Sequence, residues 1–201
     1  MKQGVLDKVR AHIYAGDDMT PVERIKAYES GMSYDRIPCV PFIGNMRCVL
    51  LGITEEEWWN DAENMARAEV MSYETFGLDR LGIGPNTKGI SEALASQFPF
   101  PEKERYVLDD YSKLGVMEAI RAETHPSIQR FLNAAELLAE SAGKIVPIEA
   151  SIGGPFTIAS FLRGIEVLLR DCRKKGDEIH KLLRIIVDSQ KSCIDALAKY
   201  G

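Results

Sequence analysis

The sequence predicts an α/β protein whose parallel sheet forms the first part of a (β/α)8 TIM barrel. Three short apolar runs of strand length alternate with longer segments in which apolar residues recur at helical spacing. Strands separated by helices imply right-handed strand–helix–strand units in one parallel sheet. A closed eight-stranded barrel needs about 250 residues, and the chain has 201. We therefore expect a single, incomplete barrel domain over residues 1–201, with a helical extension over residues 1–35.

Two helical patterns open the chain. Residues 1–19 hold a short one. Thr20, Pro21 and Glu23 then combine a helix cap, a first-turn proline and a glutamate that can return a hydrogen bond to the cap. This second helix should end at about Gly31.

A long helix is predicted between the first two strands. Residues 36–43 are apolar and β-prone, but two prolines prevent a continuous ladder on both sides, so this strand should be an edge or be bulged. Residues 54–57 form a second capping box, which opens a helix that Gly77 ends. Residues 78–83 are predicted to be the second strand, with a turn over residues 84–87.

The middle of the chain has weaker patterns. We expect residues 88–111 to be an irregular excursion over one face of the protein. Residues 111–122 are weakly helical and residues 126–143 strongly so. Residues 144–149 form an apolar run that predicts the third strand.

Two glycines directly follow this third strand. Gly153 and Gly154 form a turn without side chains, and Pro155 favours the first turn of the next helix. Another group can approach such a turn closely, while the N–H groups at the helix start point outward. Ligands of α/β proteins bind beyond the carboxyl ends of the strands. The alternative is a tight connection that uses glycine only for its permitted φ values. Further on, Asp177 is expected to cap a last helix with a wide apolar stripe.

Composition excludes several classes of function. The formal net charge is −5 and no cluster of basic residues outweighs its acidic neighbours, so we expect no nucleic-acid partner. The sequence has no signal-peptide core and no apolar run of membrane-spanning length, which predicts no membrane contact and a cytoplasmic location. The four cysteines are scattered, without a Cys-x-x-Cys pair or a histidine at ligand spacing, so reduced structural thiols are expected and no metal site is predicted.

An ordered set of motifs resembles the uroporphyrinogen decarboxylase superfamily, which includes cobalamin-dependent methyltransferases. The motifs are residues 20–24 (TPVER), 34–38 (YDRIP), 76–79 (FGLD), 92–94 (EAL) and 153–160 (GGPFTIAS). The resemblance runs from about Thr20 to the end of the chain. It implies the N-terminal half of a uroporphyrinogen decarboxylase-like (β/α)8 barrel, with its site at the carboxyl ends of the strands.

The decarboxylase branch implies three roles that this sequence fills incompletely. Its arginine motif, which binds substrate carboxylates, corresponds to residues 46–51, where Arg47 matches but Leu51 stands at the second arginine position. Its aspartate, which stabilises a protonated pyrrole ring, corresponds to Asn86, which is neutral. Its tyrosine corresponds to Phe161, which lacks the hydroxyl. These departures disfavour uroporphyrinogen decarboxylation, a step of tetrapyrrole biosynthesis, which stays as the alternative.

The sequence of residues 153–160 resembles the methyltransferase branch more than the decarboxylase branch. The resemblance implies that a methyl group moves between a corrinoid, such as methylcobalamin, and a thiol or similar acceptor. Zinc bound by a His-x-Cys pair and a later cysteine would activate the thiol in that branch. Those ligands belong to the second half of the barrel, so no zinc site is expected within residues 1–201.

Candidate substrate-binding residues lie at the presumed strand ends and in the following helix. Glu149 is the strongest candidate, because a carboxylate buried there is costly unless it binds something. Arg47 is equally compatible with ligand binding and with a salt bridge to a helix carboxylate, and Asn86 after Gly-Pro is more typical of a turn. The full set is Asn45, Arg47, Asn86, Thr87, Glu149, Ser151, Gly153 and Phe161.

A function of another class remains open, because the chain could be a non-catalytic binding or assembly module. An unpaired edge of a short parallel sheet and the apolar stripe of the last helix both favour association. We therefore expect a homo-oligomer or a completing chain, with a corrinoid protein as a further partner under the methyltransferase hypothesis.

Overall fold

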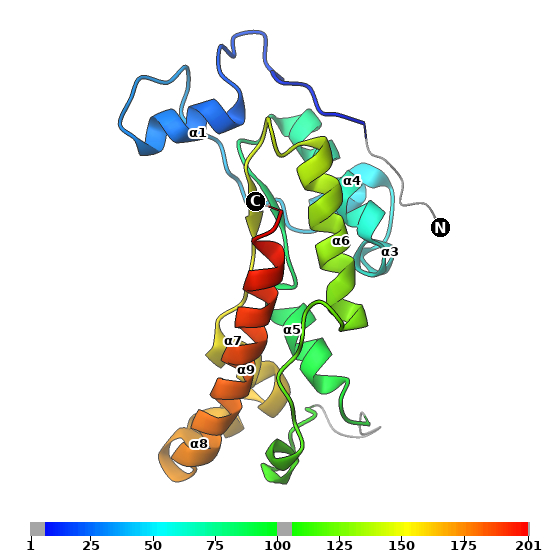
Figure 1. Cartoon of the computed structure of the whole chain (residues 1–201), viewed down its shortest axis with the longest axis vertical. Helices are drawn as coiled ribbons and strands as arrows, with labels where there is room; N and C mark the ends of the chain where they lie inside the picture. The colour runs from blue at the N-terminus through cyan, green and yellow to red at the C-terminus, as the bar shows by residue number, and fades with distance from the viewer. Residues whose placement is uncertain (1–6, 100–105, 201) are drawn as a thin grey trace. The chain divides into compact units, whose positions relative to one another are not determined.

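A computed structural model describes residues 7–99 and 106–200 (Figure 1). The helices and strands follow in chain order: α1 (Pro21–Glu29), α2 (Met46–Leu51), α3 (Glu55–Asn60), α4 (Ala62–Phe76), β1 (Leu81–Ile83), α5 (Asn86–Ala95), a 3-10 turn (Ser112–Gly115), α6 (Pro126–Ser141), β2 (Ile148–Ala150), α7 (Pro155–Arg163), α8 (Ile165–Lys174) and α9 (Gly176–Leu197). The chain forms two compact units, which are described separately. Of the described residues, the first unit holds 7–84, 130–150 and 199–200, and the second holds 85–99, 106–129 and 151–198.

The first unit is built around a parallel strand pair. β1 and β2 pair in register, with Leu81 opposite Ile148, Gly82 opposite Glu149 and Ile83 opposite Ala150. Helix α4 packs against β1, and α2 and α3 pack against α4. Trp59 of α3 meets Phe131 of α6 edge to face, with 5.3 Å between ring centroids, and Figure 1 shows α3, α4 and α6 together.

A buried cluster of ionic groups fixes the segment that precedes α2 in this unit. The guanidinium of Arg24 is fully buried and donates to Asp35 at 2.6 Å and to Asp79 at 2.5 Å. Asp79 also accepts from Arg36 at 2.6 Å and from the N–H group of Cys39 at 2.6 Å. Buried charges are tolerated only when they are paired in this way, so the cluster holds the chain on both sides of residue 36.

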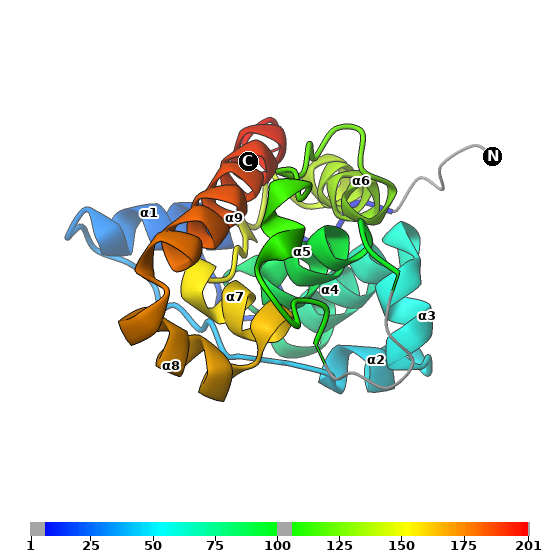
Figure 2. The same ribbon diagram turned by 90° about the horizontal axis from the view of Figure 1, so that it is seen from below.

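The second unit is helical. Helix α7 packs against α5, α8 and α9, and α8 also packs against α9. Figure 2 shows α5 and α7 side by side, next to the long helix α9. Gly164 separates α7 from α8 with a φ of 85°, and a β-carbon there would lie 2.7 Å from the ring of Tyr106. Glycine is therefore required at this break between the two helices.

The structure confirms the two capping boxes and two of the three predicted strands. Thr20 and Glu23 exchange hydrogen bonds at the start of α1, as Thr54 and Glu57 do at α3. The helix predicted to run from there to Gly77 is interrupted, because Asp61 is extended and caps α4. β1 and β2 lie in or next to the predicted runs, but each is only three residues long.

Several local predictions are wrong. Residues 36–43 form no strand. The two prolines lack N–H groups, and among the described residues the backbone of the segment is held beside β1 by a single residue pair, in which the carbonyl oxygen of Cys39 accepts from the N–H group of Asp79 at 2.9 Å. Residues 7–19 of the first helical pattern are not helical, and residues 1–6 lie outside the described residues. The weak helix over residues 111–122 is reduced to the single 3-10 turn. Conversely, the expected irregular stretch begins with helix α5.

Candidate functional site

The predicted site residues divide between the two units. Asn45, Arg47 and Glu149 belong to the first, whereas Asn86, Thr87, Ser151, Gly153 and Phe161 belong to the second. Each group is considered within its own unit.

Arg47 is engaged inside the first unit. Its Nε donates to the carbonyl oxygen of Gly44 at 2.8 Å, and its Nη1 pairs with the carboxylate of Glu69 on α4. Its guanidinium also lies 5.4 Å from the ring centroid of Trp58. Glu69 accepts from the N–H group of Gly82 in β1 at 3.0 Å, and its burial raises the pKa of this carboxyl. The structure thus contains a salt bridge between Arg47 and a helix carboxylate, and substrate binding by Arg47 stays a prediction.

Glu149 and Asn45 are both exposed and bonded within the protein. The expected burial of Glu149 is wrong: its side chain is 53% exposed and pairs with Arg80, which also binds Glu29 at 2.5 Å. The cause is the short strand β2, whose middle residue faces solvent. Asn45 donates from its amide to Glu55 at 2.5 Å. Substrate binding by these two residues stays a prediction.

Four predicted residues of the second unit come together, and we call them the glycine-turn cluster: Asn86, Thr87, Ser151 and Gly153. Asn86 has a φ of 51°, which is uncommon for a residue other than glycine, and its N–H group donates to the carbonyl oxygen of Ser151 at 3.1 Å. A β-carbon at Gly153 would lie 2.7 Å from the Cα of Thr87. The close approach that Gly153 permits is therefore made by Thr87.

Helix α9 also reaches the glycine-turn cluster. The side-chain amide of Gln190 donates to the carbonyl oxygen of Gly153. Gly154 precedes α7 in an extended conformation, and no side chain caps that helix. Within the second unit the turn is thus held by Thr87 on one side and by Gln190 on the other.

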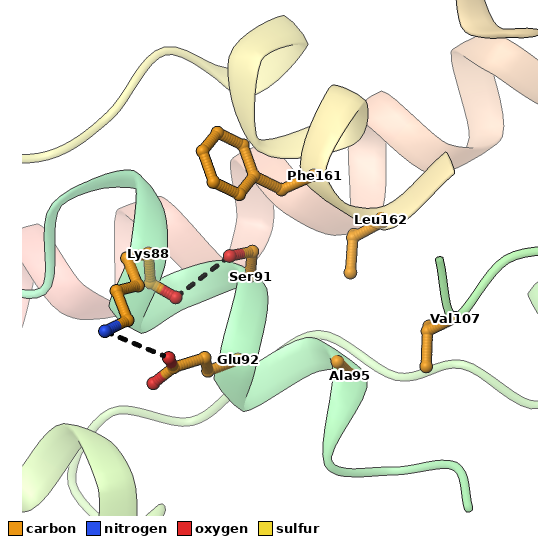
Figure 3. A pocket seen from close by; sticks show the side chains of 7 residues that line it. All are labelled: Lys88, Ser91, Glu92, Ala95, Val107, Phe161 and Leu162. Carbon is orange, nitrogen blue, oxygen red and sulfur yellow. Dashed lines mark hydrogen bonds and ion pairs between the residues drawn. The ribbon is translucent and has the colours of Figure 1, made fainter. Parts of the chain in front are cut away.

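A groove of about 250 Å³ lies between α5, α7 and the segment around Val107 (Figure 3). Lys88, Ser91, Glu92 and Ala95 line it from α5, and Phe161 and Leu162 line it from α7. Phe161 is 56% exposed, so its ring offers an open apolar face.

The polar groups of this groove lie on α5. Lys88 and Glu92 form an ion pair at 3.8 Å, one helical turn apart. The hydroxyl of Ser91 donates to the carbonyl oxygen of Lys88 at 2.9 Å. Figure 3 shows both interactions on the side opposite Phe161 and Leu162. The groove is therefore apolar on one wall and charged on the other, as a site for an amphipathic molecule requires.

A buried polar network holds the Val107 side of the groove in place. The N–H group of Leu108 donates to the carbonyl oxygen of Leu162 at 2.9 Å, and Nη1 of Arg163 donates to the carbonyl oxygen of Leu108 at 2.8 Å. Asp171 accepts from Arg163 at 2.9 Å and from the hydroxyl of Tyr111 at 2.8 Å.

The network shifts two pKa values in opposite directions. Burial opposes ionisation of Asp171, but the hydrogen bonds from Tyr111 and Arg163 outweigh it and lower the pKa of this carboxyl. Burial and the bond to Asp171 raise the pKa of Tyr111 to about 12. Both groups therefore keep their usual protonation states at neutral pH, and the network remains intact there.

The described residues do not provide a zinc site. They hold no group of three histidine, cysteine, aspartate or glutamate side chains placed to share a metal ion. All four cysteines are free; Cys39 and Cys172 are exposed, whereas Cys48 and Cys193 are buried. Burial raises the pKa of the Cys193 thiol to about 11, so this sulfur is a poor metal ligand at neutral pH.

The groove also does not by itself enclose a corrinoid. Its volume lies below the range of roughly 300–1,000 Å³ that is usual for small-molecule pockets, and a corrin macrocycle needs more. The groove can contact an edge or a side group of such a molecule. None of the helices in the described residues has the length and apolarity needed to span a bilayer.

Sequence reasoning missed the polar wall of the groove. Lys88, Ser91 and Glu92 fell in the stretch predicted to be irregular. The helical spacing of Ile90, Ala93 and Leu94, all buried in α5, is the signal that identifies this helix.

Comparison with known proteins places the chain in a family. The sequence profile of uroporphyrinogen decarboxylase (URO-D) matches residues 20–201. Among solved structures, a methyltransferase from Methanosarcina mazei is similar, with a TM-score of 0.72 and 21% sequence identity; the match covers 90% of this chain and 56% of that chain. No match was found among curated proteins. The predicted fold, a partial barrel of the uroporphyrinogen decarboxylase type, is confirmed. The chain spans little more than half the length of that structure, and it belongs to the uroporphyrinogen decarboxylase family.

Proposed function

We propose that this chain takes part in methyl transfer, with a methylated corrinoid as the donor and a thiol or similar nucleophile as the acceptor. A corrinoid-carrying protein is the partner that this reaction requires. The similar fold of a protein described as a methyltransferase supports the proposal. The side chains at positions 86 and 161 of the second unit support it as well.

The observation that carries the proposal is the lack of decarboxylase groups at two positions. A decarboxylase of this family is expected to place an aspartate where Asn86 stands and a tyrosine where Phe161 stands. Asn86 is neutral and belongs to a left-handed turn, so it cannot balance a cation that develops on a pyrrole ring. Phe161 presents only an apolar ring to the groove.

Within this proposal the residues of the second unit bind and orient rather than react. Phe161 and Leu162 provide an apolar wall against which part of a substrate can pack. Lys88 and Glu92 bring opposite charges to the facing wall, where they can bind polar substituents. Zinc would supply thiol activation in such a reaction, and the described residues do not hold it.

Titration of the chain with two macrocycles tests the proposal. Methylcobalamin and uroporphyrin are added separately, and binding is followed by the change in their visible absorbance. We expect saturable binding of methylcobalamin and much weaker binding of uroporphyrin. Tighter binding of uroporphyrin, or no binding of methylcobalamin, would contradict the proposal.

A matched pair of variants locates the binding. Phe161→Ala removes an exposed ring from the groove, and Leu169→Ala removes a side chain of similar exposure, 55% against 56%, that does not line the groove. We expect methylcobalamin affinity to fall about tenfold in Phe161→Ala, the loss of roughly 1.4 kcal/mol of apolar contact. Leu169→Ala should bind like the original chain, and equal effects of the two changes would remove the groove from the site.

A further inference from the structure

The groove beside Phe161 brings two opposite charges to one wall. Lys88 and Glu92 are the charged members of its described lining, with side chains 59% and 43% exposed. Both lie on α5, and Figure 3 shows them on the wall opposite Phe161 and Leu162. A ligand that packs against Phe161 therefore meets an ammonium and a carboxylate side by side, whose charges sum to zero.

The ion pair between these two residues is open enough for a ligand to compete with it. Nζ of Lys88 and Oε1 of Glu92 are 3.8 Å apart, farther than the roughly 2.7–2.9 Å of a charge-assisted hydrogen bond. Exposed ion pairs one helical turn apart are weak, because water solvates both groups. A ligand group placed against the pair therefore displaces a weak interaction and can gain two charge-assisted hydrogen bonds in its place.

A primary amide is the group that satisfies both charges at once. Its carbonyl oxygen accepts from the ammonium of Lys88, and its N–H group donates to the carboxylate of Glu92. An ionised carboxylate has acceptors only, so it is attracted by Lys88 but repelled by Glu92. Like charges placed against each other are a common means of rejecting the wrong ligand. The wall therefore favours neutral amide groups over carboxylates.

The two macrocycles considered above differ in these groups. The corrin ring of methylcobalamin carries amide side groups, whereas uroporphyrin carries carboxylates. We infer that the Lys88–Glu92 pair selects the ligand of the groove by the charge of its side groups, binding amides and excluding carboxylates. The inference rests on the proposed function. It adds a residue that determines specificity, Glu92, and a substrate class, a macrocycle with primary amide side groups.

Glu92→Gln tests the inference, because it removes the charge and keeps the length and an acceptor oxygen. Uroporphyrin affinity should rise about fivefold, the upper range for an exposed charge interaction. Methylcobalamin affinity should fall about twofold, since a neutral acceptor binds N–H groups less strongly than a carboxylate. Lys88→Gln removes the donor that serves both ligands, so it should weaken both. Affinities are measured from the visible absorbance of each macrocycle.

A second exposed ion pair of the second unit provides the control. Asp188 and Lys191 lie 3.5 Å apart on α9 and do not line the groove. Asp188→Asn changes the net charge by the same amount as Glu92→Gln, and it should leave both affinities unchanged. Equal gains of uroporphyrin affinity in the two variants would reduce the effect to net charge and overturn the inference.

Salt provides a further check on the origin of the selection. At 1 M salt the screening length is about 3 Å, so the gain of uroporphyrin affinity in Glu92→Gln should vanish. A gain that persists would mean that shape, and not charge, excludes uroporphyrin.

The results separate the inference from the proposed function. If methylcobalamin binds the original chain but Glu92→Gln binds uroporphyrin no better, the inference is wrong and the proposed function stands. If the original chain does not bind methylcobalamin, both are wrong.

Discussion

Thr87 occupies the space that a side chain at Gly153 would need. The Cα of Thr87 would lie 2.7 Å from a β-carbon at Gly153, and backbone cannot move aside as a flexible side chain can. The two residues come from segments 66 positions apart in the sequence. Their contact joins the start of α5 to the turn before α7 within the second unit.

Gly153→Ala should therefore destabilise the protein. Overpacking of this kind costs about 1–3 kcal/mol, measured as a lower urea midpoint with an unchanged slope. Gly154→Ala is the matched control, because Gly154 is extended and the nearest atom to its β-carbon would be 3.8 Å away. Its stability should change by less than about 0.5 kcal/mol. Equal midpoints for the two variants would refute the close contact.

Asp79→Asn should destabilise the first unit strongly. Asp79 is fully buried and accepts from Arg24, Arg36 and the N–H group of Cys39. Removing one partner from a buried ion pair costs about 3–5 kcal/mol. Asp188→Asn, which removes an exposed pair with Lys191 at 3.5 Å, should cost less than about 0.5 kcal/mol. Chemical denaturation measures the free energy of unfolding of both variants. A loss for Asp79→Asn as small as that for Asp188→Asn would contradict the stabilising role of the buried Asp79 carboxylate.

Acid should weaken the first unit through Asp35. Its hydrogen bonds from Arg24 hold the pKa of this carboxyl well below its usual range. A group with a lowered folded-state pKa contributes its stability above the unfolded pKa of about 3.9 and loses it as pH falls further. The free energy of unfolding should therefore decrease below about pH 4, and less steeply in Asp35→Asn. Parallel pH profiles for the two proteins would argue against this role.

Alkali should act on the second unit through Tyr111. Its pKa is raised to about 12, above the usual value of about 10, so the neutral phenol is favoured in the folded state. This contribution is complete below about pH 10 and is lost as pH rises towards 12. Phenolate absorbance of the original chain minus that of Tyr111→Phe should show a midpoint near pH 12. A midpoint near pH 10 would mean that Tyr111 is not held as described.

Local signals in the sequence predicted the parts of the fold that depend on few neighbours. The capping boxes at Thr20 and Thr54 and the proline that starts α7 act within one helical turn, so the adjacent residues determine them. The parallel strand pair followed from apolar runs separated by helices. For the same reason the glycine-turn cluster could be expected, since Asn86 and Gly153 both follow strands.

Features that depend on distant partners could not be predicted. Residues 36–43 have the composition of a strand, but Asp79, some 40 positions later, fixes Cys39 through its carboxylate. Glu149 ends an apolar run that suggested burial. In the structure Arg80, which directly precedes β1, pairs with it at the surface. The groove beside Phe161 needs residues from α5 that no pattern near Phe161 reveals.

The bond from Gln190 to the carbonyl oxygen of Gly153 links the glycine turn to the middle of α9, a helix of 22 residues. Loops ordinarily open independently of long helices, and their amide hydrogens exchange quickly with deuterated water. Here a side chain of the helix holds the loop, so the amides of residues 151–154 should gain protection that Gln190→Ala removes. With Gln190 in place, the turn should open together with α9, at the slow rate of that helix, rather than open independently.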